Sequence, residues 1–175
     1  MGKSSVRERI VHACMELLNT VSLESLRTQD LIDRAGVSRS SFYRAFPDKY
    51  AVVTWVYQEQ AERLLREMPE LRSWKEWTYV LHAYMREHKA FFRNIAGYRG
   101  QNSFCDFLSH YFYGNALRFH KKPLTEEQKF ALQAFSLVGA NATVEWIMNG
   151  FQPDDELLVR YLDACIPSCI RSLYE

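Results

Sequence analysis

Residues 28–49 read TQDLIDRAGVSRSSFYRAFPDK, and this stretch indicates how the chain folds. Its apolar residues recur every three or four positions, which predicts two short helices, over 28–35 and 39–45. Between them, Gly36 can adopt the left-handed conformation that reverses the chain, and Ser38 can cap the second helix. Two short helices joined by such a turn form a helix-turn-helix.

The second of these helices has one face suited to nucleic acid. Phe42 and Phe46 are four positions apart, so both are expected to face the interior. The remaining side chains then lie mostly outside, where arginine and hydroxyl groups can reach phosphates and base edges. The alternative is an ordinary solvated helix face that binds nothing. The outer residues are Arg39, Ser40, Ser41, Tyr43 and Arg44.

Two further polar residues lie at expected helix starts. Thr28 can cap the helix over 28–35. Lys49 falls in the first turn of a helix expected over 48–67, where the positive end of the helix dipole favours an anion. A phosphate there would be held by the helix N-terminus and by Lys49 together. The alternative is that the Lys49 side chain simply extends into solvent.

The rest of the chain is also expected to be helical, which makes the fold class all-α. Apolar residues keep a helical spacing almost throughout, and the chain has 7 Gly and 5 Pro. Asn149-Gly150 ends a helical pattern, and Thr125 to Gln128 fits a capping box. Besides the two helices above, we expect helices over 4–20, 48–67, 72–88, one or two within 90–120 with a break near 97–100, one up to 149, and a last one from 153.

Composition limits the classes of function. Lys plus Arg number 22 and Asp plus Glu number 21, so the net charge is +1 and any nucleic-acid contact must come from a local patch. No apolar run reaches the roughly 18 residues of a membrane span, and residues 1–6 lack the apolar core of a signal peptide. Four cysteines are too few for a disulfide scaffold. We therefore expect a cytoplasmic protein with reduced thiols and no membrane association.

The run AGVS at 35–38, followed by Phe42, Tyr43, Phe46 and Lys49, resembles the DNA-binding domain of the TetR/AcrR family of bacterial transcription regulators. The resemblance covers about residues 6–55, and the helical remainder fits the family plan. It implies that the helix over 39–45 enters the major groove. By position, the base contacts would be Arg39, Ser40 and Ser41, and the phosphate contacts Thr28, Tyr43, Arg44 and Lys49.

The chain departs from the family pattern at three places in this domain. The loop over 19–22 has no Gly, where many members have one. Ser40 stands where many members have Gly, which changes how closely the backbone approaches DNA. Ala45 stands where His or Tyr is common, so one backbone contact is expected to be missing.

The resemblance implies two domains: a helix-turn-helix DNA-binding domain over 1–50, and a helical effector-binding and dimerisation domain over 51–175. The segment 100–104, with Trp146 and Gly150, further resembles the branch that includes dihydroxyacetone-kinase-type regulators. Residues 51–151 hold 19 of the 25 aromatic residues, which either form the core or line a ligand pocket between helices. The candidate pocket residues are Tyr84, His88, Phe107, Tyr111 and Trp146.

The last two helices are the expected dimer interface, as the family uses them. Small residues in the first would permit close helix approach, and the second carries a wide apolar stripe. The alternative is that the stripe packs against its own chain. The candidate interface residues are Gly139, Ala142, Leu158, Tyr161, Leu162, Cys165, Ile166 and Cys169.

Catalytic, cofactor and metal motifs are not found in the sequence. Cys165 and Cys169 lack the C-x-x-C spacing and further ligands of a metal or redox site. The chain has no P-loop, no G-x-S-x-G and no dinucleotide-binding fingerprint. We therefore expect no enzyme activity, no cofactor and no metal.

These observations favour a ligand-responsive transcription regulator, a repressor, that binds a pseudo-palindromic DNA operator as a homodimer and responds to a small-molecule effector. The alternative is a helical adaptor or sensor that keeps the helix-turn-helix fold but binds a protein partner. Residues 1–50 carry 8 basic and 6 acidic groups, a net charge of +2, which keeps that alternative open.

Overall fold

The computed structural model describes residues 5–68, 73–100, 102–118 and 122–174. Within these ranges every regular element is a helix, which confirms the all-α prediction. The expected helix limits at residues 4, 72 and 120 lie outside the described residues. The elements are α1 (Val6–Leu18), α2 (Thr28–Ala35), α3 (Arg39–Ala45), α4 (Lys49–Glu67), α5 (Trp74–Glu87), α6 (Lys89–Ala96), α7 (Phe104–Arg118), α8 (Glu126–Met148), α9 (Asp155–Ala164) and a 3-10 segment η1 (Ser168–Leu173).

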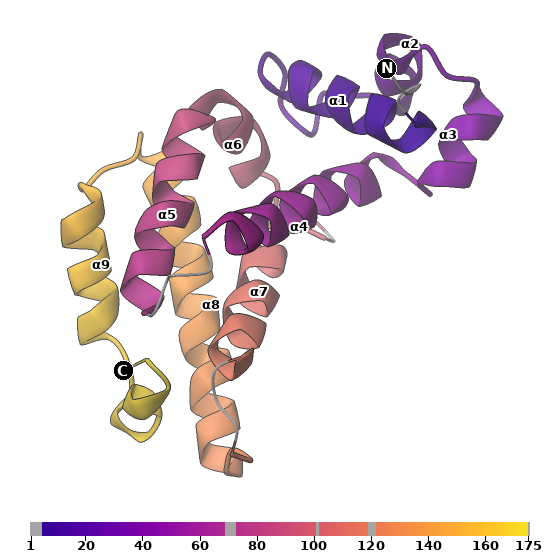
Figure 1. Cartoon of the computed structure of the whole chain (residues 1–175). Helices are drawn as coiled ribbons and strands as arrows, with labels where there is room; N and C mark the ends of the chain where they lie inside the picture. Colours follow the sequence, from indigo (N-terminus) through magenta and orange to yellow (C-terminus); the bar gives the residue numbers. More distant parts are fainter. Residues whose placement is uncertain (1–4, 69–72, 101, 119–121, 175) are drawn as a thin grey trace.

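Helices α1 to α3 form a compact head at one end of the molecule (Figure 1). Gly36 adopts φ 60°, ψ 41° after α2, and the Ser38 hydroxyl accepts a hydrogen bond from the Ser41 amide, as predicted. The N-cap of α2 is Arg27 and not Thr28, because the Asp30 carboxylate accepts from the Arg27 amide at 2.9 Å. Thr28 is therefore the first residue within the helix.

The head has its own apolar core. The side chains of Ile10 and Leu18 from α1, Leu31 from α2 and Phe42 from α3 are fully buried. Burying each such side chain stabilises the fold by roughly 1.5–3 kcal/mol. Since this core is made by all three helices, it fixes the direction in which α3 presents its outer face.

Helix α4 runs from the head into the second part of the molecule, which we call the body and which comprises α5 to η1 (Figure 1). The Asp48 carboxylate accepts from the Ala51 amide at 2.8 Å and caps α4. Val52, Val53 and Val56 of this helix are buried. The domain boundary that we expected between residues 50 and 51 falls in the first turns of α4.

In the body, α7 and α8 lie side by side and make the most extensive helix-to-helix contact (Figure 1). Thr125 caps α8 in the predicted capping box with Gln128. A side chain at Gly139 would lie 3.3 Å from the Phe112 ring of α7. Gly139 therefore permits α7 to approach α8, whereas we had expected it to permit the approach of a partner subunit.

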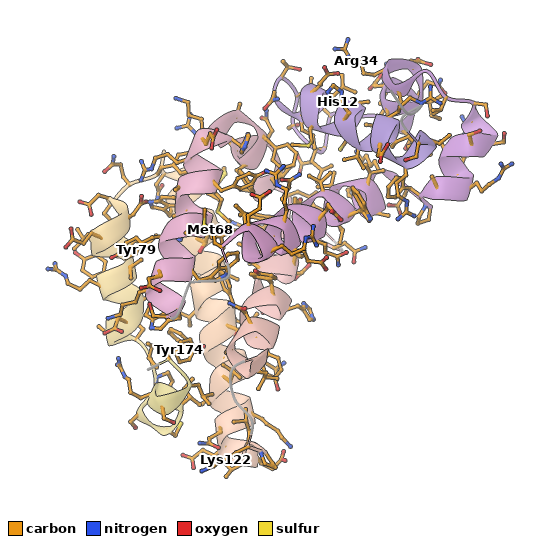
Figure 2. The ribbon with its side chains drawn as sticks, in the orientation of Figure 1. His12, Arg34, Met68, Tyr79, Lys122 and Tyr174 are labelled. Carbon is orange, nitrogen blue, oxygen red and sulfur yellow. The ribbon has the colours of Figure 1, made fainter. Side chains whose placement is uncertain are left out.

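The C-terminal segment closes the body. Gly150, at φ 73°, ends the turn after α8, and the Asp154 carboxylate caps α9. Helix α9 ends at Ala164, shortly before Pro167, and η1 follows. Tyr174, labelled in Figure 2, lies edge-on to the rings of Trp74 and Phe135 and holds the end of the chain against α5 and α8.

Candidate nucleic-acid interface and internal cavity

Helix α3 exposes four of the five residues that the sequence placed on its outer face, and the fifth, Ser41, is half-buried. Phe42 and Phe46 are buried, as predicted. Arg39 and Arg44 are exposed, and the Tyr43 side chain is 44% exposed. The Arg39 guanidinium lies 5.4 Å from the centre of the Tyr43 ring. This face thus offers two guanidinium groups and a phenol to a ligand in front of α3.

A cluster of three hydroxyl groups marks the first turn of α3. The Ser38 Oγ lies 3.0 Å from Ser40 Oγ and donates to Ser41 Oγ at 2.9 Å. Hydroxyls that are held in place in this way lose little freedom when they bind a base edge or a phosphate. The structure therefore brings Ser40 and Ser41 together with Arg39 at one end of the helix.

The other arginines in the described part of the head are engaged by groups of the protein. Arg7 donates to the Ala45 carbonyl and Arg9 to the Ala35 and Gly36 carbonyls. Arg27 pairs with Asp30 at 2.7 Å.

His12 and Arg34, labelled in Figure 2, share the Glu16 carboxylate, at 3.6 and 2.8 Å. Within the described part of the head, Arg39 and Arg44 are the arginines for which no carboxylate or carbonyl partner is found. The two described arginines of the head that lack such a partner therefore both lie on α3.

Lys49 does not present its charge to solvent. Its Nζ donates to the carbonyls of Leu23 at 2.8 Å, Glu24 at 3.2 Å and Leu26 at 2.6 Å. An ammonium group has three protons, and these three carbonyls use all of them. We had expected Lys49 to bind a phosphate, and the geometry corrects this: Lys49 holds the α1–α2 connection against α4.

Helix α6 fastens the head to the body. The Asn94 side chain donates to the Leu18 carbonyl at the end of α1, and the Leu23 amide donates to the Asn94 carbonyl, both at 2.9 Å. Beside them, the rings of Tyr50 and Tyr98 stack at 4.9 Å. A change in the position of α6 would therefore be transmitted directly to the head.

A cavity of about 20 Å³ lies between α4, α5, α6 and α7. This volume holds about one water molecule. Three of the expected pocket residues, Tyr84, Phe107 and Tyr111, line it. Burial raises the pKa of Tyr84 to about 12, so its phenol is uncharged at neutral pH.

The other two expected pocket residues lie elsewhere. His88 connects α5 to α6, and its ring centre is 4.5 Å from that of Tyr84, but His88 is not among the residues that line the cavity. Trp146 is buried in the body core, where its Nε1 donates to the Pro153 carbonyl at 2.8 Å and its ring stacks on His82. The structure therefore brings neither residue to this cavity.

Most of the expected interface residues pack within their own chain. Leu158, Leu162 and Ile166 are buried, and Ala142 and Cys169 pack against the core clusters. Tyr161 is 54% exposed and Cys165 is exposed.

Sequence reasoning missed an exposed apolar face on α8. Phe130 is 76% exposed, and Leu137, Val138 and Met148 are about half exposed. At 100° per residue, Phe130, Leu137 and Met148 fall on one line along the helix, over a length of about 27 Å. The signal was in the sequence: the apolar residues of α8 are not confined to one face, as is typical of a helix with neighbours on more than one face.

Two kinds of site have no counterpart in the described ranges. No group of three or more His, Cys, Asp or Glu side chains is placed to hold a metal ion. No described helix has the length and apolar character needed to cross a membrane.

Comparison with known proteins identifies relatives of both parts of the chain. Residues 10–54 match the family described as bacterial regulatory proteins, tetR family, and residues 72–167 match a family described as a transcriptional regulator C-terminal region. A curated relative is the HTH-type dhaKLM operon transcriptional activator DhaS of Lactococcus lactis subsp. lactis, which is 21% identical over 96 residues. That match spans 54% of this chain and about half, 51%, of the relative.

Solved structures share the fold over nearly the whole chain. The dihydroxyacetone kinase operon activator DhaS has a TM-score of 0.63 at 17% identity, with 97% of this chain and 98% of that chain covered. A TetR transcriptional regulator from Rhodococcus sp. RHA1 has a TM-score of 0.67 at 16% identity, with 93% and 97% covered. At this level of identity the likeness establishes a common fold.

Proposed function

This chain belongs to the TetR family of bacterial transcription regulators, and we propose that it binds a pseudo-palindromic DNA operator as a homodimer and responds to a small-molecule effector. The observation that carries the proposal is the outer face of α3. Arg39 and Arg44 are its free cations, while the remaining arginines of the head are engaged within the protein. A DNA-binding regulator acts on the chromosome, so we also propose a cytoplasmic location.

The experiment that tests this function is fluorescence anisotropy of labelled DNA from the region upstream of the gene. A scrambled duplex serves as the control, and the salt concentration is varied between about 50 and 200 mM, because phosphate binding releases counterions. We expect tighter, salt-sensitive binding to the upstream duplex. Binding that is weak and equal on both duplexes, with no genomic fragment selected, would favour the adaptor alternative.

Arg39→Ala is expected to weaken operator binding by about 1–3 kcal/mol and to relax the preference at one base pair. The reason is that a guanidinium at the start of α3 can donate two hydrogen bonds to a guanine edge. Operator variants measured by anisotropy would locate that base pair. Arg63→Ala is the control, because Arg63 is also exposed but lies near the far end of α4, away from the head, and pairs with Glu67. Equal loss in both variants would contradict a base-reading role.

Tyr43 and Thr28 are proposed as phosphate contacts. Tyr43 is exposed beside Arg39 and Arg44, and its hydroxyl can donate to a phosphate oxygen. Thr28 is half-buried at the start of α2, and since it does not cap that helix its hydroxyl can reach a ligand. Removing either hydroxyl should weaken binding to all sequences alike.

For the homodimer, we propose that the exposed face of α8 is the central contact. Phe130, Leu137 and Met148 lie along one line of this helix, with Val138 beside Leu137 and the exposed Asn141 amide between Leu137 and Met148. Tyr161 of α9 is a further exposed ring. An apolar strip of this length in a water-exposed position is typical of an interaction surface. A two-fold dimer would place two copies of α3 about 34–36 Å apart, the spacing of successive major grooves.

Leu137→Glu is expected to convert the dimer into a monomer, because a charge at the middle of the apolar strip would be buried without a partner. Sedimentation equilibrium would then give a mass near the 20.6 kDa of one chain in place of twice that value. Tyr79→Glu on α5 changes a similarly exposed apolar residue away from the strip and should leave the dimer intact. A dimeric Leu137→Glu variant would move the interface elsewhere.

The effector response is proposed to act through the body cavity and α6. An effector that binds one arrangement of the helices more tightly shifts the population toward it. Asn94 would carry the shift to the end of α1 and to the α1–α2 connection.

The sign of regulation is proposed to be repression, the commoner mode in the family, although the curated relative is named an activator. Deletion of the gene should then raise the transcript level of its target, and a fall would assign activation.

A further inference from the structure

The cavity wall carries two buried polar atoms that lack a partner among the described residues. They are the hydroxyl oxygen of Tyr57 and the side-chain carbonyl oxygen of Gln60, both on α4. The Tyr57 side chain is 4% exposed. Residues three positions apart lie on the same face of a helix, so both groups border the same space. One can donate a hydrogen bond and the other can accept one.

Most of the other lining residues are aliphatic or aromatic, and two of them, Tyr84 and Tyr111, also carry a hydroxyl group. The Tyr57 ring lies 4.9 Å from that of Phe104 and 5.1 Å from that of Phe107. Aromatic rings favour offset and edge-to-face contacts with a further ring. Such a wall suits a ligand whose body is itself an aromatic ring.

The described lining contains no acidic or basic side chain. The charge of Arg63 reaches Tyr84 of the lining, but Arg63 is itself exposed and pairs with Glu67. Moving an ionised group into an apolar site without a partner is strongly unfavourable. A charged effector such as a carboxylate is therefore a poor match for this cavity.

We propose that the cavity binds a small uncharged aromatic molecule with one hydroxyl group, that is, a simple phenol. Its oxygen accepts from the Tyr57 hydroxyl, and its proton is donated to the Gln60 carbonyl oxygen. Both buried atoms of α4 then gain the partner that they lack. This inference rests on the proposed function in one respect: it takes the bound phenol to be the effector of the regulator.

Binding requires the cavity to widen, because about 20 Å³ is smaller than an aromatic ring. Met85 of α5 lines it, and an unbranched thioether side chain adapts readily to a new neighbour. Tyr57 also lies close to Cys14 of α1. Burial raises the pKa of the Tyr57 hydroxyl, and the Cys14 thiol raises it further. A ligand on Tyr57 thus acts at the point where α4 meets the head.

Isothermal titration calorimetry on the full chain, without DNA, tests the proposal with phenol, toluene and benzoate. We expect phenol to bind at least about tenfold more tightly than toluene, which has the ring without the hydroxyl, and than benzoate, which has the charge. Toluene binding equal to phenol, benzoate binding most tightly, or no binding of any of the three would each overturn the proposal.

Variants locate the site. Tyr57→Phe keeps the ring and removes a hydroxyl that lacks a partner, so the protein should remain folded while the preference for phenol over toluene disappears. Gln60→Leu should have the same effect on the preference. Tyr79→Phe, which changes an exposed tyrosine of α5, is the control and should retain it. If both α4 variants still prefer phenol over toluene, phenol binds at another site and the proposed binding site is wrong.

Anisotropy on operator DNA separates this inference from the proposed function. If the chain binds DNA specifically but none of the three compounds binds, the ligand class is wrong and the regulator stands. If phenol binds as described but no DNA is bound specifically, the ligand site stands and the regulator proposal fails.

Discussion

Lowering the pH from 7 to 4 is expected to reduce the free energy of unfolding by about 3 kcal/mol through one side chain, His82. His82 is fully buried on α5, its ring stacks on Trp146 at 4.5 Å, and neither ring nitrogen has a partner among the described residues. Burial lowers its pKa from 6.5 to about 4. Of the nearby charges, Asp155 raises the pKa and Arg86 lowers it, and these two side chains pair with each other at 2.7 Å.

The direction of this pH effect follows from the pH range over which each state, folded or unfolded, binds the proton. Above pH 6.5, His82 is neutral in both the folded and the unfolded chain, so its contribution to stability does not change with pH. Between pH 6.5 and 4, the unfolded chain takes up a proton that the folded chain does not, and stability falls as the pH falls. Below pH 4 both states are protonated and the loss is complete.

Urea unfolding at pH 7 and pH 4 measures this effect. His82→Phe should reduce the pH dependence by about 3 kcal/mol relative to the wild type. It should also equal or exceed the wild-type stability at pH 7, since a ring without polar atoms leaves none unpaired. His110→Gln, at an exposed position of α7, should keep the wild-type pH dependence. If His82→Phe lost stability with acid as steeply as the wild type, the folded protein would protonate His82 freely.

The helix-turn-helix could be predicted from the sequence because its signals are local. Gly36 supplies the positive φ and Ser38 the cap, and each acts on residues at most a few positions away. The burial of Phe42 and Phe46 follows from helical spacing. Local rules of this kind determine where a helix begins and which face it hides.

The body could not be predicted to the same degree, since its arrangement depends on contacts between distant residues. The small and apolar residues of the last helices indicated that these helices pack closely against another surface. The sequence alone could not show whether that surface belongs to the same chain or to a partner. Gly139 meets Phe112 of the same chain, and Leu158 and Leu162 are buried within it. Trp146 has the apolar ring and polar edge expected of a pocket residue, but its Nε1 donates to the Pro153 carbonyl of the same chain.

The partners of Lys49 could not be predicted for a related reason. Its position at a helix start was predicted correctly, but the groups that it binds were not. The carbonyls that bind it belong to residues 23–26, more than 20 positions earlier. The sequence could not show that the α1–α2 connection turns three carbonyls toward this helix end. A cation opposes the dipole of α4 there, and these carbonyls supply the compensating negative ends of dipoles.

Lys49→Met is therefore expected to lower the free energy of unfolding by about 2–3 kcal/mol, because hydrogen bonds to a charged group contribute more than neutral ones and their loss leaves partly buried carbonyls unpaired. Urea unfolding at pH 7 measures the loss. Arg44→Met is the matched comparison, since Arg44 is exposed on α3. It should leave the stability unchanged and reduce the salt dependence of operator binding by about one phosphate contact.

The pair of variants separates a residue that holds the head together from one that binds DNA. In Lys49→Met, any loss of operator affinity should be recovered at lower temperature, where the head is folded, and the slope of affinity against salt should equal that of the wild type. Wild-type stability together with a salt dependence reduced by one phosphate contact would instead indicate that Lys49 binds a phosphate. In that case the three carbonyls of the α1–α2 connection would have to release the ammonium group when DNA binds.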